Sequence, residues 1–320
     1  GMCGIDIVVS DTDGKNYKPI ENIKNRGPDD LVKVKCNKCL FVFYRLVIVG
    51  GKQGRQPFIN RDKGTITVCN GEIYNHKEIM QEIRQLLERK NRIMPVCQAE
   101  DSDCFCIHAM FNAGVSPRSI PNYLRGEFAF VHFDGTTLYF ARDMLGKKAL
   151  YLGLHNGRLT RISSAIQAFD PADKIYHVRP GCLYQYNVQT CKLTVERYIM
   201  SFEDRFVAAM AGPSISMKQK YTLENIPKDE ATINRELFET LCEAVEIRTR
   251  QMDEVCKVGF MLSGGFDSSL VLSLALACGI KRPVQAYTFG FEKDADDVKS
   301  ARIMVDWVKA KYGPDAIDWH

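Results

Sequence analysis

A glycine-rich loop between an apolar run and a helix is the feature that most constrains this chain. The run 255–262 is typical of a buried strand, Ser263-Gly264-Gly265 forms the loop, and a helix of Ser, Leu, Val and Ala follows over 267–278. A strand over 284–291 and a helix over 296–311 come next, and this alternation predicts a parallel sheet. The loop places backbone N–H groups and the positive end of a helix dipole at one point, which is typical of an anion site.

Polar side chains around this loop suit a phosphate ligand that carries magnesium. Ser263, Ser268 and Ser269 supply hydroxyl donors, and Asp267 is suited to hold Mg²⁺ bound to pyrophosphate. The loop has no Walker lysine, which excludes the loop of kinase-like NTPases. For a Gly-Gly pair on its own, an ordinary strand-to-helix turn capped by Asp or Ser is the alternative.

The composition is that of a globular protein of about two domains. The chain has 320 residues, of which 45% are hydrophobic and 26% charged, so it can form a sizeable core. A net charge of +4 is too small to favour nucleic acid or a membrane as a partner, and no apolar stretch approaches the length of a membrane span. The 12 cysteines are irregularly spaced among apolar runs, which favours reduced thiols in a cytoplasmic protein.

Residues 3–200 alternate short β-like runs with a few helices, a pattern typical of packed sheets. The expected strands are Ile5–Val9, Leu40–Val49, Thr65–Cys69, Glu127–Phe133, Thr137–Arg142, Ala149–Leu154 and Cys182–Asn187. An apolar stripe predicts a helix over 76–90, a second helix starts near Asp103, and together they are expected to cover a sheet face. Residues 201–229 show neither the strand-like nor the helix-like spacing of apolar residues and are expected to form a linker. An amphipathic helix over 231–250 is expected to follow.

Cys3 lies where a cysteine can become a nucleophile that carries its own base. The α-amine of a first residue titrates at about pH 8 and can accept the thiol proton. We interpret Gly1 as the remnant of a cleaved expression tag, so that the natural chain begins Met2-Cys3 and Met2 is then removed. With Gly1 and Met2 attached, the α-amine does not belong to Cys3 and the nucleophile is expected to be inactive. A coincidental Met-Cys start is the alternative.

A series of motifs follows Cys3 in one order along the first part of the chain. The motifs are Met2–Ile5, Asn25–Asp29, Arg45-Leu46, Gln56-Pro57, Asn70–Asn75, Ser102-Asp103, Gly126–Phe130 and Ala141–Asp143. Alone, an Asn-Gly pair is more often a hairpin turn, and an Arg or Asp a solvated surface group. The series as a whole resembles the glutaminase domain of class II amidotransferases, which are N-terminal nucleophile (Ntn) hydrolases. The resemblance implies an α+β domain with four αββα layers over residues 3–200.

The resemblance implies a set of catalytic residues. Cys3 would attack the side-chain amide of glutamine and form a glutamyl thioester, while Asn70 and the Gly71 N–H hold the oxyanion. Arg26 is expected to play a supporting structural role beside the nucleophile.

The same resemblance implies residues that bind the amino-acid end of glutamine. Arg45 would pair with the α-carboxylate, for which its planar guanidinium is suited. Glu72 and Asp103 would receive the α-ammonium group, and Asn70 and Gly71 complete the glutamine-binding set.

The string Leu-Ser-Gly-Gly-Phe-Asp-Ser-Ser at 262–269 resembles the loop of ATP pyrophosphatases, which cleave ATP between the α and β phosphates. Combined with the glutaminase motifs, it makes the chain similar to the glutamine-hydrolysing asparagine synthetase family. That resemblance implies glutamine, aspartate and ATP as substrates, ATP and Mg²⁺ at the loop, and a homodimer. The ATP-binding residues it implies are Met261, Leu262, Ser263, Gly264, Gly265, Asp267, Ser268, Ser269 and Phe291. Residues 230–320 would be the N-terminal part of an α/β parallel-sheet ATP-pyrophosphatase domain.

Several positions depart from the pattern of that family. Members continue beyond the position of His320, so we expect the synthetase half to be truncated. Ser164-Ala165 stands where Ser-Glu is usual, and Lys147-Lys148-Ala149 replaces hydrophobic-Lys-Pro. Phe266 replaces Leu, and Glu292 stands where Gly is usual. The family resemblance also implies a tunnel for ammonia between the domains and a standard adenine pocket, and these changes weaken those two expectations more than they weaken the glutaminase. The alternatives are a ligase for another carboxylate, a bare glutaminase, and a non-catalytic regulatory or scaffold homologue.

Cys36-Asn37-Lys38-Cys39 has the spacing of half a zinc site, which Cys97, Cys104 and Cys106 could complete. Neither a second Cys-x-x-Cys nor a suitable His pair follows, so we expect a hairpin with two incidental thiols and no structural zinc.

Overall fold

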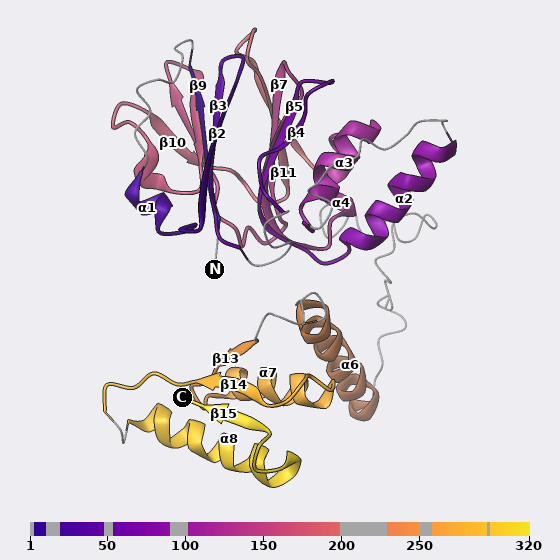
Figure 1. Ribbon diagram of the computed structural model, residues 1–320, viewed down its shortest axis with the longest axis vertical. Helices are drawn as coiled ribbons and strands as arrows, with labels where there is room; N and C mark the ends of the chain where they lie inside the picture. Colours follow the sequence, from indigo (N-terminus) through magenta and orange to yellow (C-terminus); the bar gives the residue numbers. More distant parts are fainter. Residues whose placement is uncertain are drawn as a thin grey trace. The chain divides into compact units, whose positions relative to one another are not determined.

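The computed structural model describes residues 3–10, 20–47, 54–89, 102–198, 229–249, 258–292 and 295–320 (Figure 1). The chain divides into two compact units, Gly1–Gly212 and Pro213–His320. Gly1 and Met2 lie outside the described residues, and so does the predicted linker 201–229 except for Asp229.

In the described part of the first unit, two six-stranded antiparallel sheets form the framework. The first sheet has the strand order β10-β8-β9-β1-β3-β2, and the second has the order β12-β11-β7-β6-β5-β4. The strands of the first sheet are β1 (Gly4–Val9), β2 (Asp30–Cys36), β3 (Cys39–Arg45), β8 (Tyr151–His155), β9 (Arg158–Ser163) and β10 (Lys174–His177). Those of the second are β4 (Phe58–Asn60), β5 (Thr65–Ile73), β6 (Gly126–Phe133), β7 (Thr137–Arg142), β11 (Cys182–Asn187) and β12 (Leu193–Arg197).

An apolar core fills the space between the two sheets. Phe41 and Phe43 of β3 belong to the same buried cluster as Val68 of β5, which lies in the second sheet. Val42 and Tyr44 alternate with them and belong to a separate cluster on the outer face of the first sheet. Both faces of β3 are therefore covered, and all 7 of its residues are buried.

Helices cover the outer faces of the sheets and complete four layers. Figure 1 shows α2 (His76–Arg89), α3 (Phe105–Ala113) and α4 (Ile120–Tyr123) on the outer side of the second sheet. Among the described residues, the outer layer of the first sheet consists of α1 (Glu21–Lys24) and a 3₁₀ turn, Ile166–Ala168. The predicted αββα layering is confirmed, with a much smaller helical layer on the side of the first sheet.

Strand ends and exposed strands differ from the sequence prediction. The strand expected over 40–49 ends at Arg45, because Val47 N–H donates to the Asp29 carboxylate at 2.8 Å instead of continuing a ladder. The strand expected from Ala149 starts at Tyr151. The prediction also omitted β2, β4, β9, β10 and β12. Several of these are short or exposed, so they lack the apolar run that indicates a buried strand.

In the described residues of the second unit, three parallel strands form one sheet in the order β13-β14-β15. The strands are β13 (Gly259–Met261), β14 (Val284–Tyr287) and β15 (Ile317–Trp319), and the helices are α6 (Glu230–Thr249), α7 (Phe266–Ala277) and α8 (Asp296–Tyr312). The predicted βαβα order is confirmed. The strand expected over 284–291 ends at Tyr287, and β15 was not predicted.

A buried hydrogen-bonded chain joins α3 to the second sheet. The Thr67 hydroxyl lies 2.7 Å from His108 Nδ1 and 2.7 Å from His132 Nδ1. Asn112 Nδ2 donates to His108 Nε2 at 3.1 Å, so His108 carries its proton on Nδ1, donates to Thr67, and Thr67 donates to His132. Burial lowers the pKa of His108 to about 4 and the pKa of His132 well below its usual value, so both rings are neutral at pH 7.

We expect His108 to make the first unit less stable in acid. An unfolded histidine has a pKa of about 6.5, so the stability from the lowered folded pKa is full above that value and is lost as pH falls toward about 4. Between about pH 7 and 5, the free energy of unfolding should fall by about 2 kcal/mol less in His108→Gln than in the wild type. Comparison with the wild type isolates this effect from Glu72, whose raised pKa acts in the opposite direction. Native-state hydrogen exchange of the α3 amides measures it, and equal pH dependence in both proteins would contradict it.

Candidate active site

The Cys3 thiol lies at the start of β1 and contacts the chain just beyond β3. Its sulfur accepts a hydrogen bond from Leu46 N–H at 3.4 Å, and the thiol donates to the Leu46 carbonyl oxygen at 3.5 Å. Burial raises the pKa of the Cys3 thiol, and the Leu46 N–H opposes that rise. The thiol is therefore protonated at neutral pH and needs a base to become a nucleophile.

Arg26 contacts the main chain of the residue that carries this thiol. Its Nε donates to the Cys3 carbonyl oxygen at 3.4 Å. Next to it, a Cβ on Gly4 would lie 2.3 Å from Ile23 Cγ2, so glycine is needed for β1 to pack against α1. The supporting role of Arg26 stays a prediction, and this contact is the kind that such a role requires.

Asn70 and Gly71 lie inside β5 and not in a hairpin turn. Asn70 pairs with Ala129 and Gly71 with Phe128 across the β5–β6 ladder. A Cβ on Gly71 would lie 2.3 Å from the Glu127 carbonyl oxygen, so only glycine allows this close approach. Asn70 is 2% exposed, and its Nδ2 has no hydrogen-bond partner among the described residues. A buried donor without a partner costs about 1–3 kcal/mol, which indicates a group kept for a ligand.

A cationic group and two carboxylates border the same space. Arg45, the last residue of β3, is buried, and burial lowers its pKa. The Asp103 carboxylate accepts a hydrogen bond from Ile73 N–H at 2.6 Å, and burial raises its pKa. Burial and the neighbouring Asp103 raise the pKa of Glu72 to about 8. A buried carboxylate next to a half-buried one favours a positively charged ligand group, because it would offset the repulsion between them.

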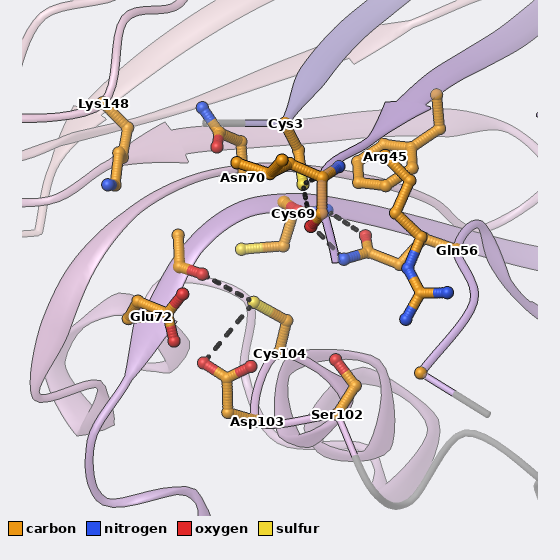
Figure 2. A pocket seen from close by; sticks show the side chains of 14 residues that line it. Cys3, Arg45, Gln56, Cys69, Asn70, Glu72, Ser102, Asp103, Cys104 and Lys148 are labelled. Carbon is orange, nitrogen blue, oxygen red and sulfur yellow. Dashed lines mark hydrogen bonds between the residues drawn. The ribbon is translucent and has the colours of Figure 1, made fainter. Parts of the chain in front are cut away.

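These side chains meet in one pocket (Figure 2). Its lining contains Cys3, Arg45, Asn70, Gly71, Glu72 and Asp103, all of which the sequence prediction names. The prediction missed part of the lining, namely Phe43, Leu46, Gly54, Gln56, Cys69, Ser102, Cys104 and Lys148. The motif strings contain Leu46, Gln56 and Ser102, but nothing in the sequence assigns them a role. Strand alternation alone could not have placed Cys69 beside Cys104, because they come from different elements.

The pocket has the chemistry to bind and cleave an α-amino acid with a side-chain carbonyl group. The Arg45 guanidinium can pair with a carboxylate, and Glu72 and Asp103 can pair with an ammonium group. The Cys3 thiol can attack a carbonyl carbon, and the Asn70 amide can donate to the oxygen that becomes negative.

The glycine-rich loop lies at the carboxyl end of β13 and leads into α7. Gly265 caps α7 and Asp267 lies in its first turn, so the helix dipole points at this loop. Ser263 Oγ lies 3.1 Å from Ser268 Oγ and accepts a hydrogen bond from Gly265 N–H at 3.3 Å. Ser269 lies one residue further into the helix. The exposed Ser263 hydroxyl, the half-buried hydroxyls of Ser268 and Ser269, a helix N-terminus and a carboxylate are donors and acceptors that fit a phosphate with Mg²⁺.

Three of the residues expected to bind ATP, namely Met261, Leu262 and Phe291, differ in exposure. Met261 is 63% exposed and Phe291 is fully exposed, so both side chains are open to a ligand. Leu262 is 1% exposed and packs in the core of the second unit, so any ligand contact it makes comes from its main chain.

We expect Gly264→Ala to damage this loop. Gly264 has a φ of 75°, and a Cβ there would lie 2.3 Å from Ala301 N and 2.4 Å from the Ser300 carbonyl carbon. Gly279→Ala is a matched control, because its φ is 79° but a Cβ there would have no neighbour within 4 Å. The control should lower the free energy of unfolding by about 1–2 kcal/mol, and Gly264→Ala should lower it by several kcal/mol more. Hydrogen exchange of the α7 amides measures both, and equal losses would contradict the clash.

The Cys36–Cys39 segment forms the expected hairpin. Cys36 pairs with Cys39 across the β2–β3 turn, and Asn37 has a φ of 49°, as a tight turn requires. Cys97 lies outside the described residues. Within the described ranges, no group of three His, Cys, Asp or Glu side chains is arranged to hold a metal ion. A search of the described helices finds none that is long and apolar enough to cross a membrane.

Two family models match the chain in succession. The glutamine amidotransferase domain matches residues 2–220, and asparagine synthase matches residues 236–312. Each match covers most of one unit of the structure.

The relatives include asparagine synthetases from yeast and a plant. Glutamine-hydrolyzing asparagine synthetase 1 of Saccharomyces cerevisiae is 30% identical over 288 residues, covering 86% of this chain and 43% of that protein. Glutamine-hydrolyzing asparagine synthetase 1 of Lotus japonicus is 29% identical over 326 residues, covering 96% of this chain and 49% of that protein. A solved structure of glutamine phosphoribosylpyrophosphate amidotransferase from B. subtilis aligns with a TM-score of 0.45 at 14% identity, over 99% of this chain and 84% of that one. The chain spans about half the length of the curated relatives it matches. On the match over 2–220, the chain belongs to the glutamine amidotransferase domain family.

Proposed function

We propose that the pocket of the first unit hydrolyses glutamine and that the ammonia serves asparagine synthesis. The observation that carries the first part is Asn70 Nδ2, which has no partner among the described residues and is buried in a pocket that also holds the Cys3 thiol. Glutamine fits this pocket because its α-carboxylate suits Arg45, and its α-ammonium group suits Glu72 and Asp103. Its side-chain amide is then left for the thiol.

The proposed reaction uses each of these groups once. The α-amine of a chain that begins at Cys3 takes the thiol proton, and the sulfur attacks the amide carbon of glutamine. Asn70 Nδ2 and the Gly71 N–H donate to the resulting oxyanion. The intermediate collapses to a glutamyl thioester as the C–N bond breaks, and ammonia leaves with the proton held by the amine. Water then hydrolyses the thioester to glutamate and restores the thiol.

The similarity of the second unit to asparagine synthase supports the acceptor half of the proposal. ATP would supply the adenylate that activates the β-carboxylate of aspartate, with pyrophosphate as the leaving group. In the loop, Ser263, Ser268 and the backbone of Gly264 and Gly265 would bind the phosphates, and Asp267 would hold Mg²⁺. Ammonia would displace AMP and give asparagine. We assign residues 3–200 to the glutaminase domain and 230–320 to the start of the ATP-binding domain.

We further propose a reducing, cytoplasmic setting and a homodimer. The described cysteines are free thiols, and the proposed chemistry requires Cys3 to stay reduced. The homodimer rests on the family resemblance, and light scattering of the purified protein tests it.

We expect glutamine to bind more tightly as pH rises toward 8. The pKa of Glu72 is raised to about 8, so its carboxyl group is largely neutral at pH 7 and becomes the better partner of an ammonium group above that pKa. In Cys3→Ala protein, which binds without turnover, the Kd for glutamine should fall about tenfold between about pH 6.5 and 8. Calorimetry measures it. Glu72→Gln should reduce this pH dependence, leaving only the part that Asp103 contributes, and Glu127→Gln, outside the pocket lining, should keep most of it.

A product assay tests the proposed function. Full-length protein that begins at Cys3 is given glutamine, aspartate and Mg-ATP, and glutamate, AMP and asparagine are measured. Asparagine and AMP formed together from glutamine support the full proposal. Glutamate without AMP or asparagine would overturn the acceptor half and leave a glutaminase. AMP formed with a different carboxylate would indicate another ligase, and absence of all turnover would indicate a non-catalytic protein.

A further inference from the structure

The side chain of Gln56 is bonded at both ends to the residue that precedes Asn70. Gln56 Oε1 accepts a hydrogen bond from Cys69 N–H at 2.6 Å, and Gln56 Nε2 donates to the Cys69 carbonyl oxygen at 3.0 Å (Figure 2). Gln56 is 7% exposed, and its amide lines the pocket. Both of its polar groups are therefore used on one residue of β5.

This contact continues the second sheet beyond the end of the β4–β5 pairing. β4 pairs with β5 only from Asn60 opposite Thr65 to Phe58 opposite Thr67. Beyond Thr67, β5 has β6 on one edge, and the Gln56 amide takes the place of a strand residue opposite Cys69 on the other. The amide thus pairs with β5 in the manner of main chain.

The bond to the Cys69 carbonyl fixes the peptide plane that leads into Asn70. Cys69 C=O and Asn70 N belong to the same planar unit, so holding one orients the other. Cys69 packs in the core under the helices, while Val68 packs between the sheets. Because strand side chains alternate, Asn70 lies on the same face as Val68. Asn70 Nδ2 has no partner of its own in the described part of the chain, so its direction depends on the main chain that carries it.

The segment that carries Gln56 is also tied to the first sheet. Arg55 Nε lies 3.0 Å from the Asp30 carboxylate of β2. Asp30 is paired with Arg45 in the β2–β3 register. Two neighbouring residues of one short segment thus contact both sheets. Arg55 contacts Asp30, which is paired with Arg45 in the first sheet. Gln56 contacts Cys69, which precedes Asn70 in the second sheet.

We propose that Gln56 is a positioning residue for glutamine hydrolysis, holding Asn70 where its amide meets the oxyanion. This inference rests on the proposed function of the pocket. Gln56 does not touch the reacting atoms; it acts through Asn70. Gln56→Met keeps the length of the side chain but removes both bonds to Cys69. A shift of the oxyanion donor by about 1 Å can cost up to about 100-fold, so we expect kcat to fall about 10- to 50-fold while KM for glutamine changes less than about threefold.

A double-mutant cycle separates positioning from a merely structural role. If Gln56 acts through Asn70, Gln56→Met should cost less than about threefold in kcat when Asn70 is already replaced by alanine. Thr67→Val is the matched control: it lies on the same strand and loses two buried hydrogen bonds, but it is outside the pocket lining. Its kcat should stay within about threefold of the wild type. Alkylation of the Cys3 thiol by iodoacetamide should keep its rate in Gln56→Met, because the thiol does not depend on Gln56.

The outcomes are distinct. Wild-type protein that does not hydrolyse glutamine removes the proposed function itself. Two results would overturn the inference alone if the wild type is active. The first is that Gln56→Met lowers kcat by the same factor whether or not Asn70 is present. The second is that Thr67→Val lowers kcat as much as Gln56→Met does. Gln56→Glu provides a second variant if the Met variant does not fold, because it keeps the acceptor for Cys69 N–H and loses only the donor to the Cys69 carbonyl. It should lower kcat at least about fivefold, again only when Asn70 is present.

Discussion

Cys3→Ala is expected to lower glutamine hydrolysis by at least about 10³-fold in protein processed to begin at residue 3. In the proposed reaction the thiol forms the thioester, and no other described thiol of the pocket lies next to the start of β1 in the sequence. The proposed acceptor half does not use Cys3, so a full-length protein should still form asparagine from added ammonia. Protein that retains Gly1 and Met2 should be inactive with glutamine for a different reason, since the α-amine is then two residues away from the thiol.

Cys69→Ala is the matched control for this experiment. Cys69 is a buried thiol of the same pocket, but its side chain packs in the core under the helices. We expect its kcat to stay within about threefold of the wild type, since the proposed reaction does not use the Cys69 thiol. Release of glutamate, measured with glutamine alone, compares the two variants. Equal losses in both would mean that the pocket requires intact packing and not the Cys3 nucleophile.

Asn70→Ala is expected to lower kcat about 10²- to 10³-fold while KM for glutamine changes less than about threefold. In the proposed reaction the amide donates to an oxygen that becomes negative only in the transition state, so its loss should affect the chemical step more than binding. The free energy of unfolding should change by less than about 1 kcal/mol, because the buried Nδ2 has no partner to lose among the described residues. Steady-state kinetics and hydrogen exchange of the β5 amides measure the two effects.

Asn75 offers a control with the opposite signature. It belongs to the same sequence motif as Asn70, but its amide donates to the Tyr123 carbonyl at 2.8 Å and accepts from Arg125 N–H at 2.8 Å. Asn75→Ala should therefore cost about 1–2 kcal/mol of stability and leave kcat within about threefold of the wild type. A stability loss in Asn70→Ala as large as that in Asn75→Ala would contradict the view that Asn70 is kept for a ligand.

The sequence predicted the part of the site that lies in short motifs. Cys3, Arg45, Asn70, Glu72 and Asp103 were named from residue type and family resemblance, and the structure places them in one pocket. The layered fold was also predictable, because the central strands have apolar runs and α2 has a clear apolar stripe.

The rest of the site depends on contacts between elements that are distant in sequence. Leu46 contacts Cys3 through its main chain, which leaves no trace in residue type. Gln56 has a role only because β4 stops short of Cys69, and strand pairing of that kind is not visible in a local pattern. β2 was missed although its half-buried and exposed residues alternate. Its two lysines make the segment resemble a polar loop, and Leu31 lies on the exposed face with them. Such lysines are typical of an edge strand, which β2 is.

The departures from the family pattern lie at defined places in the fold. Ser164 Oγ accepts a hydrogen bond from Ile5 N–H at 3.1 Å, and Ala165 is buried beside it in the outer cluster of the first sheet. Lys148 lines the pocket, and its Nζ lies 4.0 Å from a Glu127 carboxylate oxygen that also lies 3.5 Å from Lys147 Nζ. The pocket thus contains a lysine close to its acidic end, where the prediction placed only acidic groups.

Covalent labelling tests the central claim that Cys3 is the nucleophile of a glutamine-binding pocket. Protein that begins at Cys3 is incubated with a diazoketone analogue of glutamine, and the intact mass and the labelled peptide are determined. We predict one adduct per chain, located on Cys3, prevented by excess glutamine and strongly slowed in Arg45→Met. Labelling of Cys69 or Cys104 instead, or labelling of Cys3 that glutamine does not prevent, would contradict the account.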